Sequence, residues 1–320
     1  MNTYLTQLKR EFWENRGGFV WAPSAVAIAF FSIFLLGLLV AQTHIADAQI
    51  MGVKISQLRI NVPDTVLPEI LNGFQIFHSV IALIMQMVLG IVLFFYFIAS
   101  LFDERKDRSV LFWKSMPVSD RDTVLSKIAA ATLVAPLIAL AVTIVFNLLL
   151  VLLLGAFLSL NGVNAWKLLL WQAAPFKVWL TLLVGIPVNA IWALPSIGWL
   201  MLVSSWARGK PFLWAVLVPI VCGVMLTVFD AMSSLSIPDS WYWREVFWRG
   251  LASVSPWSFD VAGGFRFGID INHNTQAFEL ISPTSLLAVL TSAKTWVGAV
   301  AGAAMIAGAV HLRRTRELTD

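Results

Sequence analysis

Long apolar runs separated by short charged segments dominate the pattern of this chain. Six of these runs are almost free of charge, and each is long enough to cross a bilayer as a helix, which takes about 20 apolar residues. The runs are 22–42, 74–101, 128–160, 178–206, 211–229 and 286–310. The pattern predicts an all-α polytopic membrane protein with about six transmembrane helices.

The composition supports this class. Hydrophobic residues make up 59% of the 320 residues and charged residues only 12%, a balance that no soluble domain has. No shift in composition divides the chain, so we expect a single transmembrane domain over residues 1–320. The net charge of +4 comes from short basic blocks beside the apolar runs, where membrane topology explains it, and nucleic acid is not implied as a partner.

The distribution of basic residues predicts the orientation. Fourteen of the 22 lysines and arginines lie in the segments that share a side with the N-terminus, if there are six spans. By the positive-inside rule, both termini are therefore expected in the cytoplasm.

The first 21 residues precede the first run and carry an amphipathic pattern. Leu5, Leu8 and Phe12 recur at helical spacing, while Lys9 and Arg10 fall on other faces. This indicates a short helix that lies on the membrane surface.

A charge-dense insert, residues 102–125, lies between the second and third runs. A mixed-sign segment is followed by an apolar stretch, and Pro117 then ends the helix. Ser119 and Asp122 have the spacing of a capping box, which opens the next helix. The insert is thus predicted as helix, turn, helix, with the alternative that it is a solvated loop whose charges only set the topology.

The outer segment 230–285 is rich in aromatic residues interleaved with arginines. In a helix, Trp243, Phe247 and Leu251 would share an apolar face, which suits a surface or half-inserted helix. We regard Trp243, Phe247 and Trp248 as candidate interface residues. The alternative is an interfacial anchor, because amphipathic aromatics gather at the headgroup level.

The chain lacks the sequence patterns of several catalytic classes. The single cysteine, Cys222, excludes an intramolecular disulfide and a cysteine metal cluster. The sequence contains no phosphate-binding G-x-x-x-x-G-K-[ST] pattern, no H-E-x-x-H and no G-x-S-x-G. We therefore predict no catalytic residues, no metal and no cofactor, and expect any ATP hydrolysis to occur in a partner.

The insert ERKDRSVLFWKSMPVSDRDTVLSK resembles the membrane subunits of type-2 ABC exporters. That family has an acidic-basic pair, a K-S-x-P-V/I-S turn and a lysine before the next span at this place, and its six-span layout and N-terminal helix are also similar. The resemblance implies that residues 101–117 form a coupling helix in a groove of a separate cytoplasmic ABC ATPase. The residues expected to couple are Glu104, Arg105, Lys106, Asp107, Arg108, Trp113, Lys114 and Pro117.

The resemblance also implies the function. The chain is expected to be a permease subunit in a bacterial cytoplasmic membrane that pairs with a second permease subunit, identical or paralogous. Together they would export an amphiphilic solute, peptide, antibiotic or lipid-like molecule. Because similar short helices before the last span close the outer end of the path in that family, the resemblance also implies that Trp243, Phe247 and Trp248 could form an outer gate. Two alternatives remain open, namely a membrane-embedded assembly or sensory protein that docks a soluble partner, and a lipid-modifying enzyme. For the enzyme, the loose candidates are Asp260, Asp270, His273 and Glu279.

Overall fold

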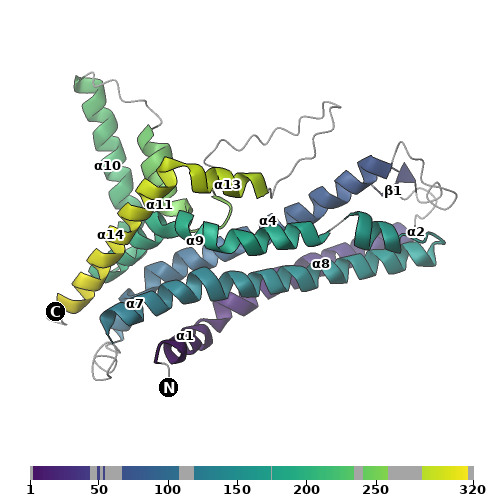
Figure 1. Cartoon of the computed structure of the whole chain (residues 1–320), viewed down its shortest axis with the longest axis horizontal. Helices are drawn as coiled ribbons and strands as arrows, with labels where there is room; N and C mark the ends of the chain where they lie inside the picture. Colours follow the sequence, from purple (N-terminus) through teal and green to yellow (C-terminus); the bar gives the residue numbers. More distant parts are fainter. Residues whose placement is uncertain are drawn as a thin grey trace.

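The computed structural model describes residues 3–43, 49–50, 53–54, 67–107, 119–173, 175–233, 241–258 and 283–315. Within these residues, six helical stretches are long and apolar enough to cross a membrane. They are Gly17–Thr43, Ile70–Lys106, Asp120–Leu160, Leu168–Trp206, Pro211–Met232 and Ala293–Thr315. The predicted all-α polytopic fold is confirmed, and both chain ends lie at the same end of the bundle (Figure 1).

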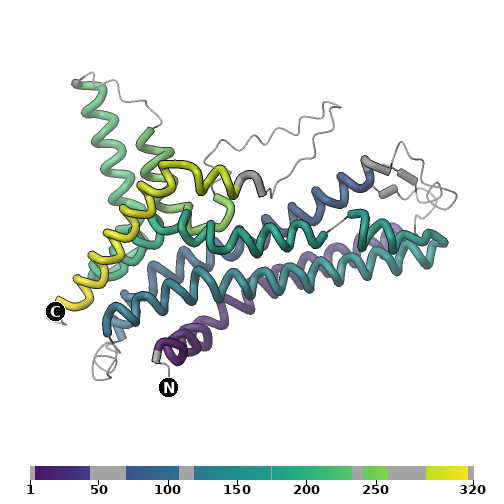
Figure 2. Tube along the Cα trace, viewed as in Figure 1, coloured from purple at the N-terminus to yellow at the C-terminus, as the bar shows by residue number. Residues whose placement is uncertain are grey.

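The described elements follow one another as mostly long helices (Figure 2). The first half contains α1 (Thr3–Glu14), the π-helical η1 (Gly17–Trp21), α2 (Ala22–Thr43), the antiparallel strands β1 (Gln49–Ile50) and β2 (Val53–Lys54), α4 (Leu67–Ser100) and α5 (Phe102–Lys106). The middle contains α7 (Asp120–Ala129), η2 (Ala130–Val134), α8 (Ala135–Leu160), η3 (Leu168–Gln172) and α9 (Pro175–Trp206). The last part contains α10 (Pro211–Ser233), η4 (Tyr242–Trp248), α11 (Arg249–Ala252), α13 (Pro283–Thr291) and α14 (Ala293–Thr315).

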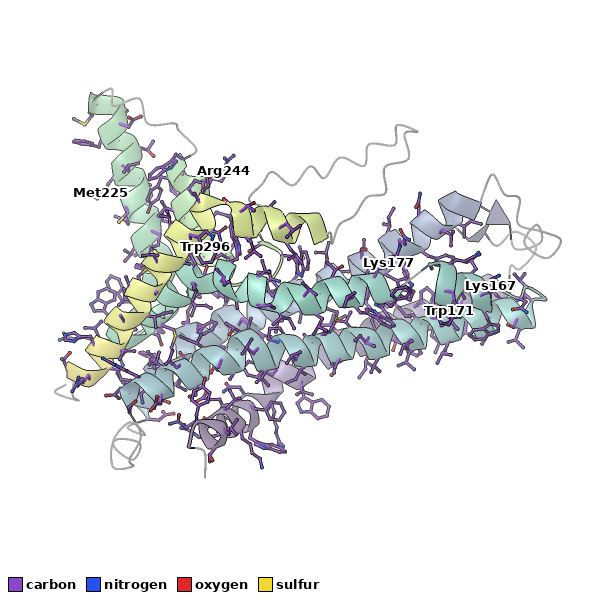
Figure 3. All side chains as sticks on the ribbon, in the orientation of Figure 1. Lys167, Trp171, Lys177, Met225, Arg244 and Trp296 are labelled. Carbon is purple, nitrogen blue, oxygen red and sulfur yellow. The ribbon has the colours of Figure 1, made fainter. Side chains whose placement is uncertain are left out.

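Helices α4 and α9 form the centre of the bundle. More than half of the apolar window of each is buried, and α9 packs against α4, α8, α10, α11, α13 and α14. By contrast, α2 and α10 bury little of their apolar surface, and Figure 3 shows Met225 of α10 pointing away from the bundle. Such outward apolar faces are suited to lipid or to another membrane subunit.

Several predicted boundaries differ from the structure, among them the start of the second helix, which is Leu67 and not residue 74. The third span begins at Asp120 rather than at residue 128, because α7, η2 and α8 follow one another without a break. The last run, predicted as one span over 286–310, is split between α13 and α14 at Ser292. Lys294 directly after this break is 63% exposed in its side chain, so the membrane-spanning helix begins at the polar break and not inside the apolar run.

Small residues bring α9 and α14 together. A Cβ atom added to Gly302 would overlap the backbone of Leu194 and Pro195 in α9, and one added to Gly198 would overlap the backbone of Gly302. Gly298 and Gly302 have the GxxxG spacing that allows close helix approach, and here they serve packing within one chain.

We predict that Gly302→Ala destabilises the protein by about 1–3 kcal/mol, because the two helix backbones must separate to admit the methyl group. Thermal unfolding in detergent measures this. Gly37→Ala is the matched control, since no atom lies near an added Cβ there. Equal melting temperatures for the two variants would contradict the packing role of Gly302.

Candidate functional site

The expected coupling residues lie partly in α5. Glu104, Arg105, Lys106 and Asp107 belong to this short helix and its C-terminal cap, whereas Arg108, Trp113, Lys114 and Pro117 fall outside the described residues. The charged side chains of α5 and its cap differ in their exposure to solvent. Glu104 is only 8% exposed, whereas Asp103, Lys106 and Asp107 are exposed.

Glu104 is the centre of a buried ion network. One carboxylate oxygen lies 2.6 Å from Nη1 of Arg313 in α14, and the other lies 3.0 Å from Nζ of Lys127 in α7. Arg313 also donates from Nε to Asp120 at the start of α7, at 3.0 Å. The carboxylate thus connects α5 to α7 and α14.

A second buried carboxylate extends the network to α1. Lys127 donates to Oε1 of Glu11 at 2.8 Å, and the Tyr96 hydroxyl of α4 donates to Oε2 of Glu11 at 2.9 Å. Arg10 lies 3.9 Å from Glu104. We call Arg10, Glu11, Glu104, Asp120, Lys127 and Arg313 the charged cluster. It contains three acidic and three basic residues, so its charges balance, as burial of ions requires.

Arg105 fastens α5 to the end of α9. Its Nη2 donates to the carbonyl oxygens of Ser204 and Ala207, at 2.6 and 2.9 Å, and these lie in the last turn of α9 or just after it. Carbonyls there have no partners within their own helix, and a cation is favoured at that end. The Ser204 hydroxyl in turn accepts from the backbone N–H groups of Leu101 and Phe102.

The sequence explains how α7 presents its two cluster residues. Ser119 caps the helix, accepting a hydrogen bond from the backbone N–H of Asp122 at 3.1 Å, so the predicted cap is confirmed. Asp120 and Lys127 are seven residues apart, which places them on one face of the helix. The capped start therefore fixes which face carries the charges.

The outward side of α5 borders a cleft of about 420 Å³ between α1, α4, α5 and α7. Glu14, Asp103 and Asp107 line it together with Arg10. This end of the bundle therefore combines a buried charged interior with a hollowed, charged surface beside α5.

We predict that Glu104→Ala lowers the free energy of unfolding by about 3–5 kcal/mol, because it leaves Lys127 and Arg313 buried without their shared carboxylate. Chemical unfolding in detergent, followed by tryptophan fluorescence, measures the loss. Asp103→Ala changes the exposed neighbouring residue and should have little effect. Similar losses in both variants would contradict the structural role of Glu104.

At the other candidate site, η4 carries the aromatic residues proposed as an outer gate. Trp243 and Phe247 are in contact, with ring centroids 5.3 Å apart, and Trp243 packs over Gly223 of α10. Trp248 is exposed. The predicted helix is present, and the inward pairing of Trp243 with Phe247 agrees with the predicted apolar face, although the helix is π-helical. A gating role stays a prediction.

After η4 the chain enters the bundle. Gly90 of α4 packs against Ser255, and the buried Trp257 packs against Gly185 of α9. We call residues 249–258 the inserted segment. After α11 the backbone leaves regular helical geometry, and polar groups at such depth require partners. Helix α9 contributes polar contacts to the segment. The indole N–H of Trp192 donates to the Ser258 hydroxyl, and the Ser196 hydroxyl donates to the carbonyl oxygen of Arg249 in α11, both at 3.0 Å.

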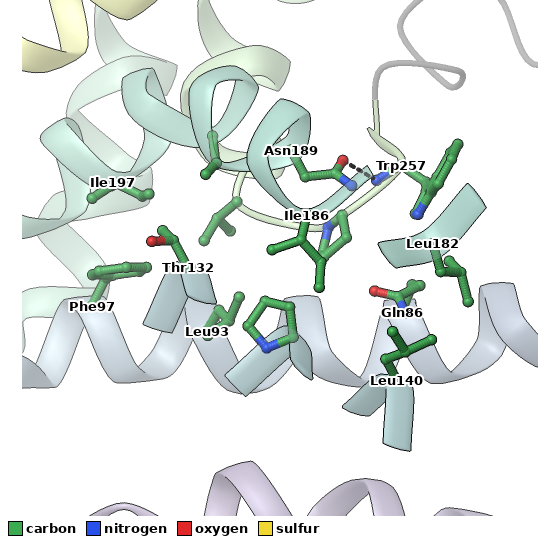
Figure 4. A pocket seen from close by; sticks show the side chains of 15 residues that line it. Gln86, Leu93, Phe97, Thr132, Leu140, Leu182, Ile186, Asn189, Ile197 and Trp257 are labelled. Carbon is green, nitrogen blue, oxygen red and sulfur yellow. Dashed lines mark hydrogen bonds between the residues drawn. The ribbon is translucent and has the colours of Figure 1, made fainter. Parts of the chain in front are cut away.

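Trp257 has an unusual backbone conformation. Its φ is 65°, a left-handed value that is strained for a bulky residue. Its backbone N–H donates to Oδ1 of Asn189 at 3.0 Å, the bond drawn in Figure 4. Asn189, a polar residue within the apolar run 178–206, thus holds a strained turn. The adjoining cavity is about 20 Å³, room for one water molecule and not for a solute.

We predict that Asn189→Leu destabilises the protein by about 1–3 kcal/mol, because the Trp257 N–H loses its acceptor in a buried position. Thermal unfolding checks this. Thr291→Val serves as the control, since that hydroxyl bonds only within α13. A variant as stable as the wild type would show that the turn does not depend on Asn189.

The histidine of α4 is buried and contacts a polar residue of α8. His78 is buried, and its Nδ1 lies 3.4 Å from Oδ1 of Asn147 in α8. This contact joins α4 to α8, which is the ordinary role of such residues in a membrane bundle. Nε2 of His78 and Nδ2 of Asn147 have no hydrogen-bond partner among the described residues. The acidic and histidine residues considered for an enzyme, 260–279, lie outside the described residues.

Comparison of the chain with protein-family models, with curated proteins and with solved structures finds no match.

Proposed function

We propose that this protein is the permease subunit of an ATP-binding-cassette exporter in a bacterial cytoplasmic membrane, with both termini inside. It would pair with a second permease subunit, identical or paralogous, and depend on a separate cytoplasmic ATPase. Its cargo would be an amphiphilic solute, peptide, antibiotic or lipid-like molecule. The proposal rests on the resemblance of the insert to type-2 ABC exporters and on the geometry around α5.

The mechanical connection of α5 is the observation that carries the proposal. Glu104 binds α7 and α14, and Arg105 binds the end of α9. The same cluster reaches α1 through Glu11. A push on α5 would therefore be transmitted to four other elements at once, as a coupling helix requires. Packed cores change between discrete arrangements and do not deform continuously. These contacts would therefore rearrange together when α5 moves.

The exposed side of α5 is suited to the ATPase. Asp103, Lys106 and Asp107 point outward beside the 420 Å³ cleft. Exposed charges of both signs give an interface its register and its rate of association. The division into inward and outward charges separates the residues that would touch the partner from those that transmit its movement.

The interior of the bundle favours a path formed between two subunits. The central cavity beside Asn189 holds only one water molecule, whereas α2 presents a large apolar face outward. A solute path along that face would need a second subunit to close it. Pairing of two such subunits is accordingly part of the proposal.

The competing function is an interaction protein whose charged end docks a soluble partner without solute transport. The same exposed residues of α5 favour it, because they would serve any cytoplasmic partner. The identity of the partner distinguishes the two functions.

We predict that the tagged protein, extracted gently from its native membrane, co-purifies with a stoichiometric ABC ATPase that hydrolyses ATP. The triple variant Asp103→Asn, Lys106→Gln, Asp107→Asn should weaken this association by on the order of tenfold, because it removes the outward charges and leaves the charged cluster intact. Quantitative mass spectrometry of the purified complex and its ATPase rate give the two measurements.

The control removes exposed charge of the same end from another part of the chain, as Lys9→Gln with Arg16→Gln, and should retain the ATPase, because neither residue lines the cleft. Unfolding of the triple variant is excluded if its melting temperature equals that of the wild type. A stably folded protein that purifies without an ATPase would contradict the exporter proposal, and a different stoichiometric partner would favour the interaction protein.

A further inference from the structure

A second, larger cavity lies away from the charged cluster. It measures about 660 Å³ and lies between α9, α10, the η4–α11 segment and α14. Volumes of about 300–1,000 Å³ are typical of small-molecule sites. Its lining is mainly apolar and includes Trp199, Val218, Cys222, Glu245, Arg249 and Lys294.

One wall of this cavity carries a buried guanidinium. Arg249 is 7% exposed, and its carbon Cζ lies 4.4 Å from the ring centre of Trp192. The group also covers Gly298, where any Cβ atom would overlap it. Among the described residues, Nε and Nη2 of Arg249 have no hydrogen-bond partner. Donors of a buried guanidinium require acceptors, so this group is prepared for a ligand.

The neighbouring carboxylate is already engaged. Glu245 forms an ion pair with Lys294 and lies 3.6 Å from Arg244. The hydrogen bond from Lys294 lowers the pKa of Glu245, so the carboxylate stays ionised. Burial lowers the pKa of Arg249, yet a guanidinium remains protonated at neutral pH. Arg249 and Lys294 thus line the cavity with the single carboxylate of Glu245, which leaves a positive excess, whereas Arg244 is not among the residues that line it.

The surroundings indicate where a ligand would come from. Val246 and Val297 at the cavity are exposed, and α10 and α14 bury little of their apolar surface, so the cavity opens beside faces suited to lipid. An occupant therefore needs an apolar body and an anionic group. A free anion would leave the apolar walls without contacts.

We propose that this cavity binds an anionic lipid of the surrounding bilayer, with its phosphate on Arg249 and Lys294 and an acyl chain along Trp199 and Val218. Bidentate recognition of phosphate is what a guanidinium does best. This binding does not require ATP-driven transport. The lipid proposal can therefore fail without affecting the exporter proposal, and the reverse also holds.

Cys222 offers a direct test, because it is the only cysteine of the chain and lines the cavity. The protein is placed in nanodiscs of phosphatidylcholine, with or without phosphatidylglycerol of the same acyl chains, and the alkylation rate of Cys222 by a small membrane-permeable maleimide is measured. A bound lipid covers the thiol. We expect about tenfold slower alkylation with the anionic lipid where it exceeds its Kd about tenfold.

Two variants identify the group responsible. Arg249→Gln should abolish the protection, whereas Arg244→Gln, which removes an arginine that is 59% exposed in its side chain, should retain it. Both variants experience the same surface potential of the anionic bilayer, so a general effect of charge on the thiol would appear equally in both. Arg249→Lys, which keeps the charge and loses the bidentate donors, should give partial protection.

Several results would overturn the proposal. Equal alkylation rates of the wild-type protein in neutral and anionic nanodiscs would do so without any variant, even if Arg249→Gln fails to fold. Protection that persists in folded Arg249→Gln would assign it to another site. Equal protection by inorganic phosphate in neutral nanodiscs would identify a water-accessible anion site in place of a lipid site.

Discussion

The arrangement of this bundle depends on one buried carboxylate. Glu104 is buried where α4 meets α5, and Lys127 and Arg313 stabilise its charge there from two other helices. In a membrane protein the hydrophobic effect does not determine which helices pack together, since lipid tails are as apolar as leucine. Ion pairs and close glycine contacts provide the missing specificity. The charged cluster fixes one end of the bundle, and the α9–α14 glycine contact fixes its middle.

Helix α9 has a comparable organising role at depth. Between Pro187 and Pro195 it presents Asn189 and Trp192 to the inserted segment. Ser196 follows directly and holds the same segment. Prolines weaken a helix by removing backbone donors, and here the stretch that they flank is stiffened from outside by the segment it binds. The inserted segment and this part of α9 therefore form one body.

Sequence patterns predicted the spans well because a bilayer demands long uninterrupted apolar helices, and such runs are visible without any knowledge of packing. The Ser119 cap was equally predictable, since capping is local. The partners of Glu104 were not, because Arg313 is 209 residues away and nothing in the pattern pairs them. The only available signal was that Glu11, Lys127 and Arg313 all flank spans on the same predicted side. The split at Ser292 was missed because the polar stretch 291–295 is short and apolar residues on both sides of it form one long run. The roles of Asn189 and Arg249 depend on contacts that periodicity does not encode.

The separation of Glu104 from Arg313 also bears on how the protein is made. Arg313 is synthesised 209 residues after Glu104, and three further membrane spans lie between α7 and the end of α14. Among the described residues, the opposing charges near Glu104 before α14 is inserted are Lys127 and Arg10. Water must solvate this end of the growing bundle through most of biogenesis. The charged cluster is thus completed late in assembly. A partly inserted chain differs chemically from a finished one, because it lacks the ion pair between Glu104 and Arg313.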